Sequence, residues 1–470
     1  MNGILKVGEP LKRFEDESLL RGEGQFVDNL DMQDQVFLHF HRSVIAHGRI
    51  QTIHVEKARE MPGVIGIFSG KDLLEDKVRP VPVNMPFTRE DGSPATSAPY
   101  FPLATDAVRF AGQAVAMVIA ETAIQAEDAA ECIEVEYEEL PVLTSLAEAV
   151  KPDAPKIWEE ISDNVAAAKT LGNQEEVDAV FRKAHHITKL ELVNPRLIGN
   201  PIEPRTSICE YDPESGRRTL HAGHQAPWRL KNGFAQMFQE DPEMFRIVVR
   251  DIGGGFGTKT PLYPEDAALV YASGKLKRNI RWRSSRSDEF HTTLHARNQE
   301  TVAEMAFDQN GKILALRAET LANVGGYLIN PGMFIPLRLS PSVISSMYHL
   351  PAVFLSTRCV MTNTAPLGAF RGAGRPEGIY LTERLMDQAA REMNIDPAEL
   401  RRRNMVKSEQ IPTTPRWTKV STADSLKWSW MKHSIILIGT VSGNAGNNPE
   451  NQENSVDVVL GVISNGPDLN

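Results

Sequence analysis

Cysteine is scarce in this chain, and the few cysteines are far apart. The 470 residues include three, Cys132, Cys209 and Cys359, with no CxxC pair and no cysteine or histidine at metal-ligand spacing. A disulfide framework needs a set of closely spaced cysteines, and a zinc site needs clustered Cys and His ligands. We therefore predict neither, expect no metal held by protein side chains, and favour a reducing, cytoplasmic location.

Long apolar runs and an excess of positive charge are lacking as well. Residues 1–13 have no apolar core of a secretory signal, and stretches such as Ile435–Val441 are far shorter than the roughly 20 residues of a membrane span. The formal net charge is −10, whereas proteins that bind nucleic acid usually present a basic face. We predict a soluble protein that has no membrane span and does not bind nucleic acid.

The chain has enough apolar sequence for more than one domain. Hydrophobic residues make up 41% of 470 positions, and single cores stop growing near roughly 250 to 300 residues. Residues 1–150 predict a small α+β domain. Strands are expected at Val36–His41, Val64–Phe68 and Ala114–Ala120, and apolar residues at helical spacing predict a helix over Ala123–Ile133.

The rest of the chain divides by composition. Residues 151–174 carry Pro152, Pro155 and Gly172 without a sustained apolar period and predict a linker, and residues 175–406 predict a larger mixed domain. Expected elements of that domain are strands at Phe245–Arg250, Ile280–Arg283, Thr301–Phe307 and Val353–Val360, a hairpin turn at Asp308–Gly311, and helices over Gly378–Met393 and from Asp396-Pro397.

Residues 407–470 form an atypical tail. Arginine is frequent up to Arg416 and absent afterwards, while asparagine and glycine crowd the segment. A flexible tail is the simplest interpretation of such a composition.

Two glycine runs stand out as candidate binding loops. The first glycine run, Asp251–Lys259, follows a predicted strand, and the second glycine run, Ala369–Glu377, precedes a predicted helix. Bare backbone allows close approach to a ligand, and Arg371 with the amides beside it suits an anion. A nucleotide P-loop is disfavoured because Thr258 stands where glycine is needed. A glycine bulge at a sheet edge and a plain helix-entry loop remain the alternatives.

A charged cluster between the runs has another interpretation. Its residues read as a strand-to-loop segment and predict an ion-paired surface rather than a metal or acid–base site. The members are Arg286, Asp288, Glu289, His291 and His295.

Several motifs occur together in a specific order. They are Arg13–Asp16 with Gly22–Phe26, Met61–Val64, Val108–Gln113, Glu203–Arg205, Gln225–Pro227, and the two glycine runs. In this order they resemble the molybdopterin-binding large subunit of the xanthine dehydrogenase, aldehyde oxidase and aerobic carbon-monoxide dehydrogenase family. The resemblance covers roughly residues 6–405.

The resemblance implies an α+β fold, with an α/β hammerhead domain followed by a mixed α/β molybdenum-cofactor-binding domain. In the family, the residue at Gln225 hydrogen-bonds an oxo ligand of the metal, the loop at Phe256 lies beside it through its main chain, and Arg371 lies in the active-site loop. The expected cofactor-binding residues are Gln225, Gly254, Gly255, Phe256, Gly257, Arg371, Gly372 and Ala373.

The resemblance also implies a reaction and partners. The expected activity is oxidative hydroxylation of an aldehyde or N-heterocycle with water as oxygen donor. The cofactor is molybdenum-molybdopterin, for which the bacterial-looking pattern suggests the cytosine dinucleotide form. Electrons would leave through 2Fe-2S and FAD groups on a small iron–sulfur subunit and a medium FAD subunit, in a hetero-oligomer. The family base is a glutamate near the C-terminal end, so no catalytic residue is identified here.

Departures from the family pattern narrow the substrate. Gly372 stands where carbon-monoxide dehydrogenases carry cysteine, and Thr260 stands where xanthine-oxidising members carry glutamate. Ala373 replaces the phenylalanine of purine enzymes, so less ring stacking over the substrate is expected. An aldehyde or N-heterocycle is therefore favoured over carbon monoxide or a purine.

The resemblance ends near Pro415, although family large subunits continue into a second cofactor-binding domain. The change of composition there suggests a frameshift. Two functional classes follow: a molybdenum hydroxylase large subunit that is incomplete in this chain, or a non-catalytic remnant that folds without cofactor. A carbon-monoxide dehydrogenase-like subunit of unknown substrate is a third interpretation.

Overall fold

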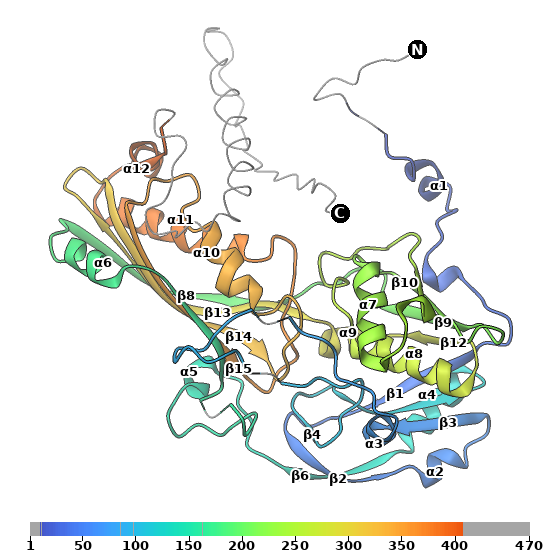
Figure 1. Cartoon of the computed structure of the whole chain (residues 1–470). Coiled ribbons are helices and arrows are strands. Elements are labelled where there is room, and N and C mark those ends of the chain that lie inside the picture. The colour runs from blue at the N-terminus through green and yellow to red at the C-terminus, as the bar shows by residue number, and fades with distance from the viewer. Residues whose placement is uncertain (1–9, 11, 85, 97, 162, 408–470) are drawn as a thin grey trace. The chain divides into compact units, whose positions relative to one another are not determined.

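The computed structural model describes residues 10, 12–84, 86–96, 98–161 and 163–407. The chain up to Met405 forms one compact unit, with helices and strands mixed throughout (Figure 1). Apart from Lys407, the predicted tail at 407–470 lies outside the described residues. No helix in the described ranges is long and apolar enough to cross a membrane.

The largest sheet has seven strands in the order β11-β10-β9-β12-β1-β5-β3. It draws on both predicted domains, because β1 pairs in parallel with β12 (Val36 opposite Ile280) and antiparallel with β5. Its strands are β1 (Val36–Arg42), β3 (Val64–Ser69), β5 (Ala114–Ala120), β9 (Thr206–Tyr211), β10 (Arg218–Ala222), β11 (Phe245–Val248) and β12 (Ile280–Arg283).

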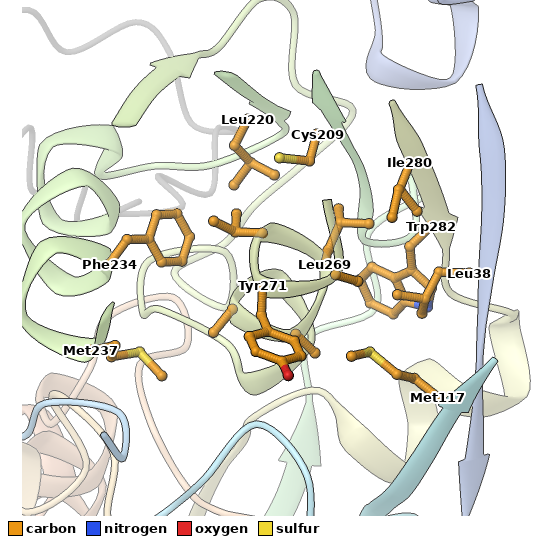
Figure 2. Packing of buried hydrophobic residues seen from close by; sticks show 14 of the residues in the cluster. Leu38, Met117, Cys209, Leu220, Phe234, Met237, Leu269, Tyr271, Ile280 and Trp282 are labelled. Carbon is orange, nitrogen blue, oxygen red and sulfur yellow. The ribbon is translucent and has the colours of Figure 1, made fainter. Parts of the chain in front are cut away.

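Two helices cover this sheet and complete the main core. Helix α7 (Pro227–Phe238) lies against β11, and helix α8 (Pro264–Leu276) lies against β9, β10 and β12 (Figure 1). Figure 2 shows Phe234 of α7 and Leu269 of α8 pointing into the same core as Leu38 of β1 and Met117 of β5. The first and second predicted domains therefore share one hydrophobic core.

A second sheet has five strands in the order β7-β15-β14-β13-β8. The expected turn at Asp308–Gly311 is confirmed, since it joins β13 and β14 in an antiparallel hairpin. Helix α11 packs on β8 and carries the second glycine run at its start (Figure 1). The strands are β7 (Val165–Gly172), β8 (His186–Ile198), β13 (His295–Phe307), β14 (Ile313–Gly325) and β15 (Ala352–Met361).

The third sheet is small, and the remaining helices are mostly short. Strands β4 (Ala107–Val108), β2 (Gly48–His54) and β6 (Glu134–Glu139) pair in that order. The other helices are α1 (Asp16–Leu20), α2 (Glu56–Arg59), α3 (Gly70–Glu75), α4 (Ala123–Glu131), α5 (Leu146–Ala149), α6 (Gln174–Phe181), α9 (Arg286–Thr292), α10 (Ser340–Ser342), α11 (Arg375–Glu392) and α12 (Pro397–Asn404). Short 3-10 segments lie at Val27–Asn29 and Pro242–Met244, and a π turn lies at Ile335–Leu339.

Several predicted elements differ from the structure. Strand β7 occupies part of the predicted linker; its small residues Val165–Ala168 are buried but give no alternation with polar residues that a pattern could detect. Helix α11 begins at Arg375, three residues earlier than predicted, because Pro376 is compatible with a first helical turn. Ile379, predicted on its buried stripe, is 41% exposed.

Candidate functional site

The first glycine run leaves β11 and folds against Glu203 and Gln225. The Gly253 N–H donates to Glu203 Oε2 at 2.8 Å, and the Thr258 hydroxyl donates to Gly255 O at 2.8 Å. A Cβ at Gly253 would lie 2.5 Å from Glu203 Cβ, and one at Gly255 would lie 2.6 Å from the Gln225 carboxamide carbon. Glycine is needed at both positions because the loop backbone lies directly against those side chains.

Gln225 lies next to this run, just before α7. Its own N–H donates to Lys259 O at 2.8 Å, and its side-chain Oε1 accepts a hydrogen bond from the Gly257 N–H at 2.8 Å. The side chain is exposed, and because Oε1 is taken by an N–H, Nε2 is left as a donor with no partner among the described residues. An uncharged donor is thus available beside the loop.

The second glycine run turns through left-handed backbone into α11. Gly372, Ala373 and Gly374 have φ values of +94°, +32° and +86°, and Gly374 is the N-cap of the helix. Glycine adopts this region without steric cost, whereas Ala373 is strained there. The turn leaves the Arg371 side chain exposed, three residues before the N-cap of an 18-residue helix. The dipole of that helix favours negative charge at its N-terminus.

The two glycine runs meet through a backbone hydrogen bond. The Arg371 N–H donates to Phe256 O at 2.8 Å, and a Cβ at Gly257 would lie 3.1 Å from Ala369 O. Phe256 is held at φ +52° with its ring 45% exposed, a strained backbone for a bulky residue. The structure thus brings Gln225, Phe256 and Arg371 together, although Phe256 and Arg371 are more than a hundred residues apart in sequence.

The other predicted residues lie within or beside this cluster. Gly255 lies against the Gln225 side chain and Gly257 lies against Ala369. Gly372 and Ala373 follow Arg371 in the chain. Gly254, at φ +99°, lies instead beside Pro201 and the Phe256 ring. The role of all eight residues in holding a cofactor remains a prediction.

Sequence reasoning missed two buried ion pairs beneath the runs. Lys259 Nζ lies 2.7 Å from Glu203 Oε2, and Arg297 Nη1 lies 3.0 Å from Glu377 Oε1. Glu203, Lys259 and Glu377 lie in motifs that the sequence singles out, so these three residues could have been proposed as part of the site. Arg297 had no signal in the sequence, because its partner is 80 residues away.

Family models match nearly the whole described unit. A molybdopterin cofactor-binding domain matches residues 157–405, which is more than half of the chain. The a/b hammerhead domain of aldehyde oxidase and xanthine dehydrogenase matches residues 21–141. This chain belongs to the xanthine dehydrogenase, aldehyde oxidase and carbon-monoxide dehydrogenase family of molybdopterin-binding subunits.

Curated relatives and solved structures agree with the family. The carbon monoxide dehydrogenase large chain of Hydrogenophaga pseudoflava is 33% identical over 419 residues, covering 86% of this chain and 51% of the relative. The nicotine 6-hydroxylase large subunit of Paenarthrobacter nicotinovorans is 30% identical over 403 residues, covering 85% and 48%. The crystal structure of quinoline 2-oxidoreductase from Pseudomonas putida 86 superposes with a TM-score of 0.83 at 29% identity, covering 93% of this chain and 55% of that one. The chain spans about half the length of the curated relatives it matches.

The residues at the junction of the runs fit the family cofactor. Molybdopterin is rigid, polar and phosphate-bearing, and it needs close backbone approach with donors rather than carboxylates. The glycines at which an added Cβ would collide with neighbouring atoms allow that close approach. Gln225 Nε2 and the exposed Arg371 guanidinium supply hydrogen-bond donors. We call these residues the cofactor cradle: Gln225, Gly253–Gly257 and Arg371–Ala373.

Burial fixes the charge state of groups next to the cradle. Desolvation lowers the pKa of His224 to about 4, so its ring is neutral near pH 7. Its Nδ1 accepts from the Ala226 N–H at 3.0 Å and its Nε2–H donates to Pro261 O at 3.0 Å, which leaves no free valence for a ligand. Desolvation likewise lowers the pKa of Lys259, against the opposing effect of Glu203. His224 supports the entry to α7 and Gln225.

The prediction that the charged cluster forms an ion-paired surface is wrong in part. Arg286–Thr292 form helix α9, and Glu289 is buried within an ion pair to Arg205 at 3.1 Å. Arg205 in turn pairs with Glu265 at 3.1 Å. The pattern missed this because the partner Arg205 lies just before β9, 84 residues earlier in the chain.

Proposed function

We propose that this chain is the cofactor-binding part of a molybdenum hydroxylase that hydroxylates an aldehyde or N-heterocycle with oxygen from water. The observation that supports it most directly is the junction of the two glycine runs at the Arg371 N–H to Phe256 O bond, with the Gln225 amide beside it. When bound, the molybdenum cofactor would supply the electron-accepting centre and activate water-derived oxygen.

The residues of this chain would bind and orient rather than transfer protons. Gln225 would donate from Nε2 without adding charge, and the glycines would let backbone lie against the pterin. Arg371 would neutralise negative charge of the cofactor through its exposed guanidinium. None of the cradle residues is a general base, so a base would have to come from outside the cradle.

The substrate class is inferred from position 372. Carbon-monoxide dehydrogenases carry cysteine there by the resemblance, but in this chain Gly372 has φ +94° and a Cβ would lie 2.8 Å from the Pro376 ring. A cysteine would therefore be both strained and crowded in this backbone. The names of two relatives, a nicotine 6-hydroxylase and a quinoline 2-oxidoreductase, favour the N-heterocycle. The carbon-monoxide dehydrogenase-like alternative rests on the 33% identity to such a large chain.

The finer details are proposed from the family. We expect the cytosine dinucleotide form of the pterin, 2Fe-2S and FAD carried by small and medium partner subunits, a hetero-oligomer, and a cytoplasmic location. The alternative is a chain that folds without binding cofactor. It has one observation in its favour, since the cradle residues Gln225 and Arg371 are exposed in the described unit.

Cofactor content separates the alternatives. The chain is produced in cells supplied with molybdate, with and without co-produced small and medium partner subunits, and its molybdenum, oxidised pterin and released nucleotide are measured per chain. We expect metal and pterin in equal amounts, with cytidine monophosphate released by acid. Gln225→Ala should lower retained molybdenum about tenfold or more, by loss of a hydrogen bond to a charged group. Gln236→Ala, an exposed glutamine on α7, is the matched control. Folded chain without metal in every preparation would support the remnant instead.

A further inference from the structure

Each glycine run rests on a buried ion pair that binds the run's own backbone. At the first run, Lys259 Nζ contacts both Glu203 Oε2 (2.7 Å) and Glu203 O (2.9 Å). The same Glu203 Oε2 accepts from the Gly253 N–H at 2.8 Å. The carboxylate therefore joins the beginning of the run to its end.

The second pair has the same arrangement. Arg297 Nη1 donates to Glu377 Oε1 at 3.0 Å, and Arg297 Nη2 donates to Arg371 O at 2.8 Å. Glu377 lies in the first turn of α11. The guanidinium thus joins the cradle arginine's backbone to the helix that follows it.

Both pairs are almost completely removed from solvent. The side chains of Lys259 and Glu203 are 3% and 9% exposed, and those of Arg297 and Glu377 are 6% and 2% exposed. A buried pair stabilises a fold little, because desolvation offsets the attraction, but loss of one partner is strongly destabilising. Such a pair holds a position more than it adds stability.

Each pair also leaves one carboxylate oxygen without a donor. Glu203 Oε1 and Glu377 Oε2 are buried and form no hydrogen bond among the described residues. An unsatisfied buried acceptor is destabilising, because it has lost its hydrogen bonds to water without replacement. Arg297 is itself in left-handed backbone, at φ +65°. An unpartnered carboxylate oxygen thus occurs in the ion pair beside each glycine run. A contribution to stability does not explain why both pairs carry this cost.

We propose that Glu203–Lys259 and Arg297–Glu377 are positioning residues that hold the two glycine runs in register, so that the cradle exists before the cofactor arrives. This inference rests on the proposed function for its purpose, but its physical content is local. The hydrogen bond from the Arg371 N–H to Phe256 O joins the two runs. A backbone displacement at either ion pair therefore also displaces the other run. Neither pair is placed in contact with the cofactor.

The test compares local loosening with global loosening. Hydrogen exchange is followed by mass spectrometry in the full chain, for Lys259→Met, Glu203→Gln, the double variant and Arg297→Met. We expect the amides of the two glycine runs to exchange about tenfold faster or more in Lys259→Met and Arg297→Met, while β7 and β15, which carry neither residue, keep wild-type rates. The double variant should lie closer to wild type than Lys259→Met, because no lone buried charge remains.

Arg42→Met is the matched control. Arg42 is 11% exposed and pairs with buried Glu265, but it contacts neither run. We expect Arg42→Met to speed hydrogen exchange in the seven-stranded sheet. Exchange in the two glycine runs should change no more than exchange in the residues around them. Equal loosening of all elements in Lys259→Met, or unchanged exchange in the runs, would overturn the inference. Hydrogen exchange is measured without cofactor, so a chain that never takes up molybdenum defeats the proposed function and leaves this test intact.

A second readout applies to chain that contains cofactor. Lys259→Met and Arg297→Met should lower molybdenum per chain about tenfold or more, and Glu203→Gln less, because its amide oxygen can still accept from the Gly253 N–H. Wild-type metal content in Lys259→Met with loosened runs would overturn the claim that the pair prepares the cradle.

Discussion

At the residue scale, the site combines strained and neutral groups that the surrounding fold holds in place. Phe256 stays in left-handed backbone although it is bulky, and its carbonyl is fixed by Arg371. His224 stays neutral because its ring is buried and both nitrogens are hydrogen-bonded to backbone. In each case the surrounding fold imposes a state that the residue alone would not prefer.

The neutral His224 predicts a pH-dependent contribution to stability. Its pKa in the folded chain is about 4, below the roughly 6.5 of an exposed histidine, so the unfolded chain binds the proton more readily. Its stabilising effect is full above about pH 6.5 and is lost as pH falls through about 4. The difference in unfolding free energy between wild type and His224→Gln should therefore shrink by on the order of 3 kcal/mol over that range.

Urea unfolding at a series of pH values measures this difference. Burial raises the pKa of Asp266 to about 6, which acts in the opposite direction, but it is present in both proteins and cancels. His54→Gln, at a half-exposed ring, is the surface control substitution. A difference for His224→Gln that is constant from pH 7 to pH 4 would contradict the neutral buried ring.

At the scale of elements, α12 fastens the β13–β14 hairpin. Asn404 at its end is buried, and its Oδ1 accepts from the Ile313 N–H at 2.8 Å. Its Nδ2 donates to Gly311 O at 2.7 Å and to Leu400 O at 2.9 Å. One side chain thus satisfies backbone groups of both the helix and the hairpin turn.

Removing this side chain should loosen the hairpin. Asn404→Ala leaves buried donors and acceptors without partners, so we expect a loss of about 2 to 4 kcal/mol of unfolding free energy, measured by urea unfolding. Asn310→Ala, at an exposed asparagine in the same turn, should change it by less than about 0.5 kcal/mol. Equal effects of the two substitutions would show that the bridge contributes nothing specific.

At the scale of the whole described unit, the two matched family domains are interdependent. Strand β1 of the hammerhead region pairs with β12 of the cofactor-binding region. The core in Figure 2 takes Leu38 and Met117 from the first and Phe234 and Leu269 from the second. Separating the two regions would divide the seven-stranded sheet between β1 and β12 and expose the core residues of β1 and β5.

The hammerhead region alone should therefore fail to fold cooperatively. We expect residues 21–150 to melt broadly and to bind a hydrophobic dye, because the apolar faces of β1 and β5 lose their cover. Residues 10–405 should melt in a sharp transition with little dye bound. Circular dichroism and dye fluorescence measure both. A sharp, dye-free transition of residues 21–150 would show that its own sheet suffices.

The sequence by itself determined the local structure and the family. Strands β5 and β12 follow the predicted bounds, and Asp396 caps α12 through the Glu399 N–H at 2.9 Å, because propensity, alternation and capping act over a few residues. The ordered motifs determined the family in the same way, since each is a short stretch. Only the tertiary structure decided that β7 joins a sheet, that Glu289 is buried, and that the Arg371 N–H donates to Phe256 O. These facts depend on pairing and burial between distant segments, where a side chain's partner is set by how the whole chain packs.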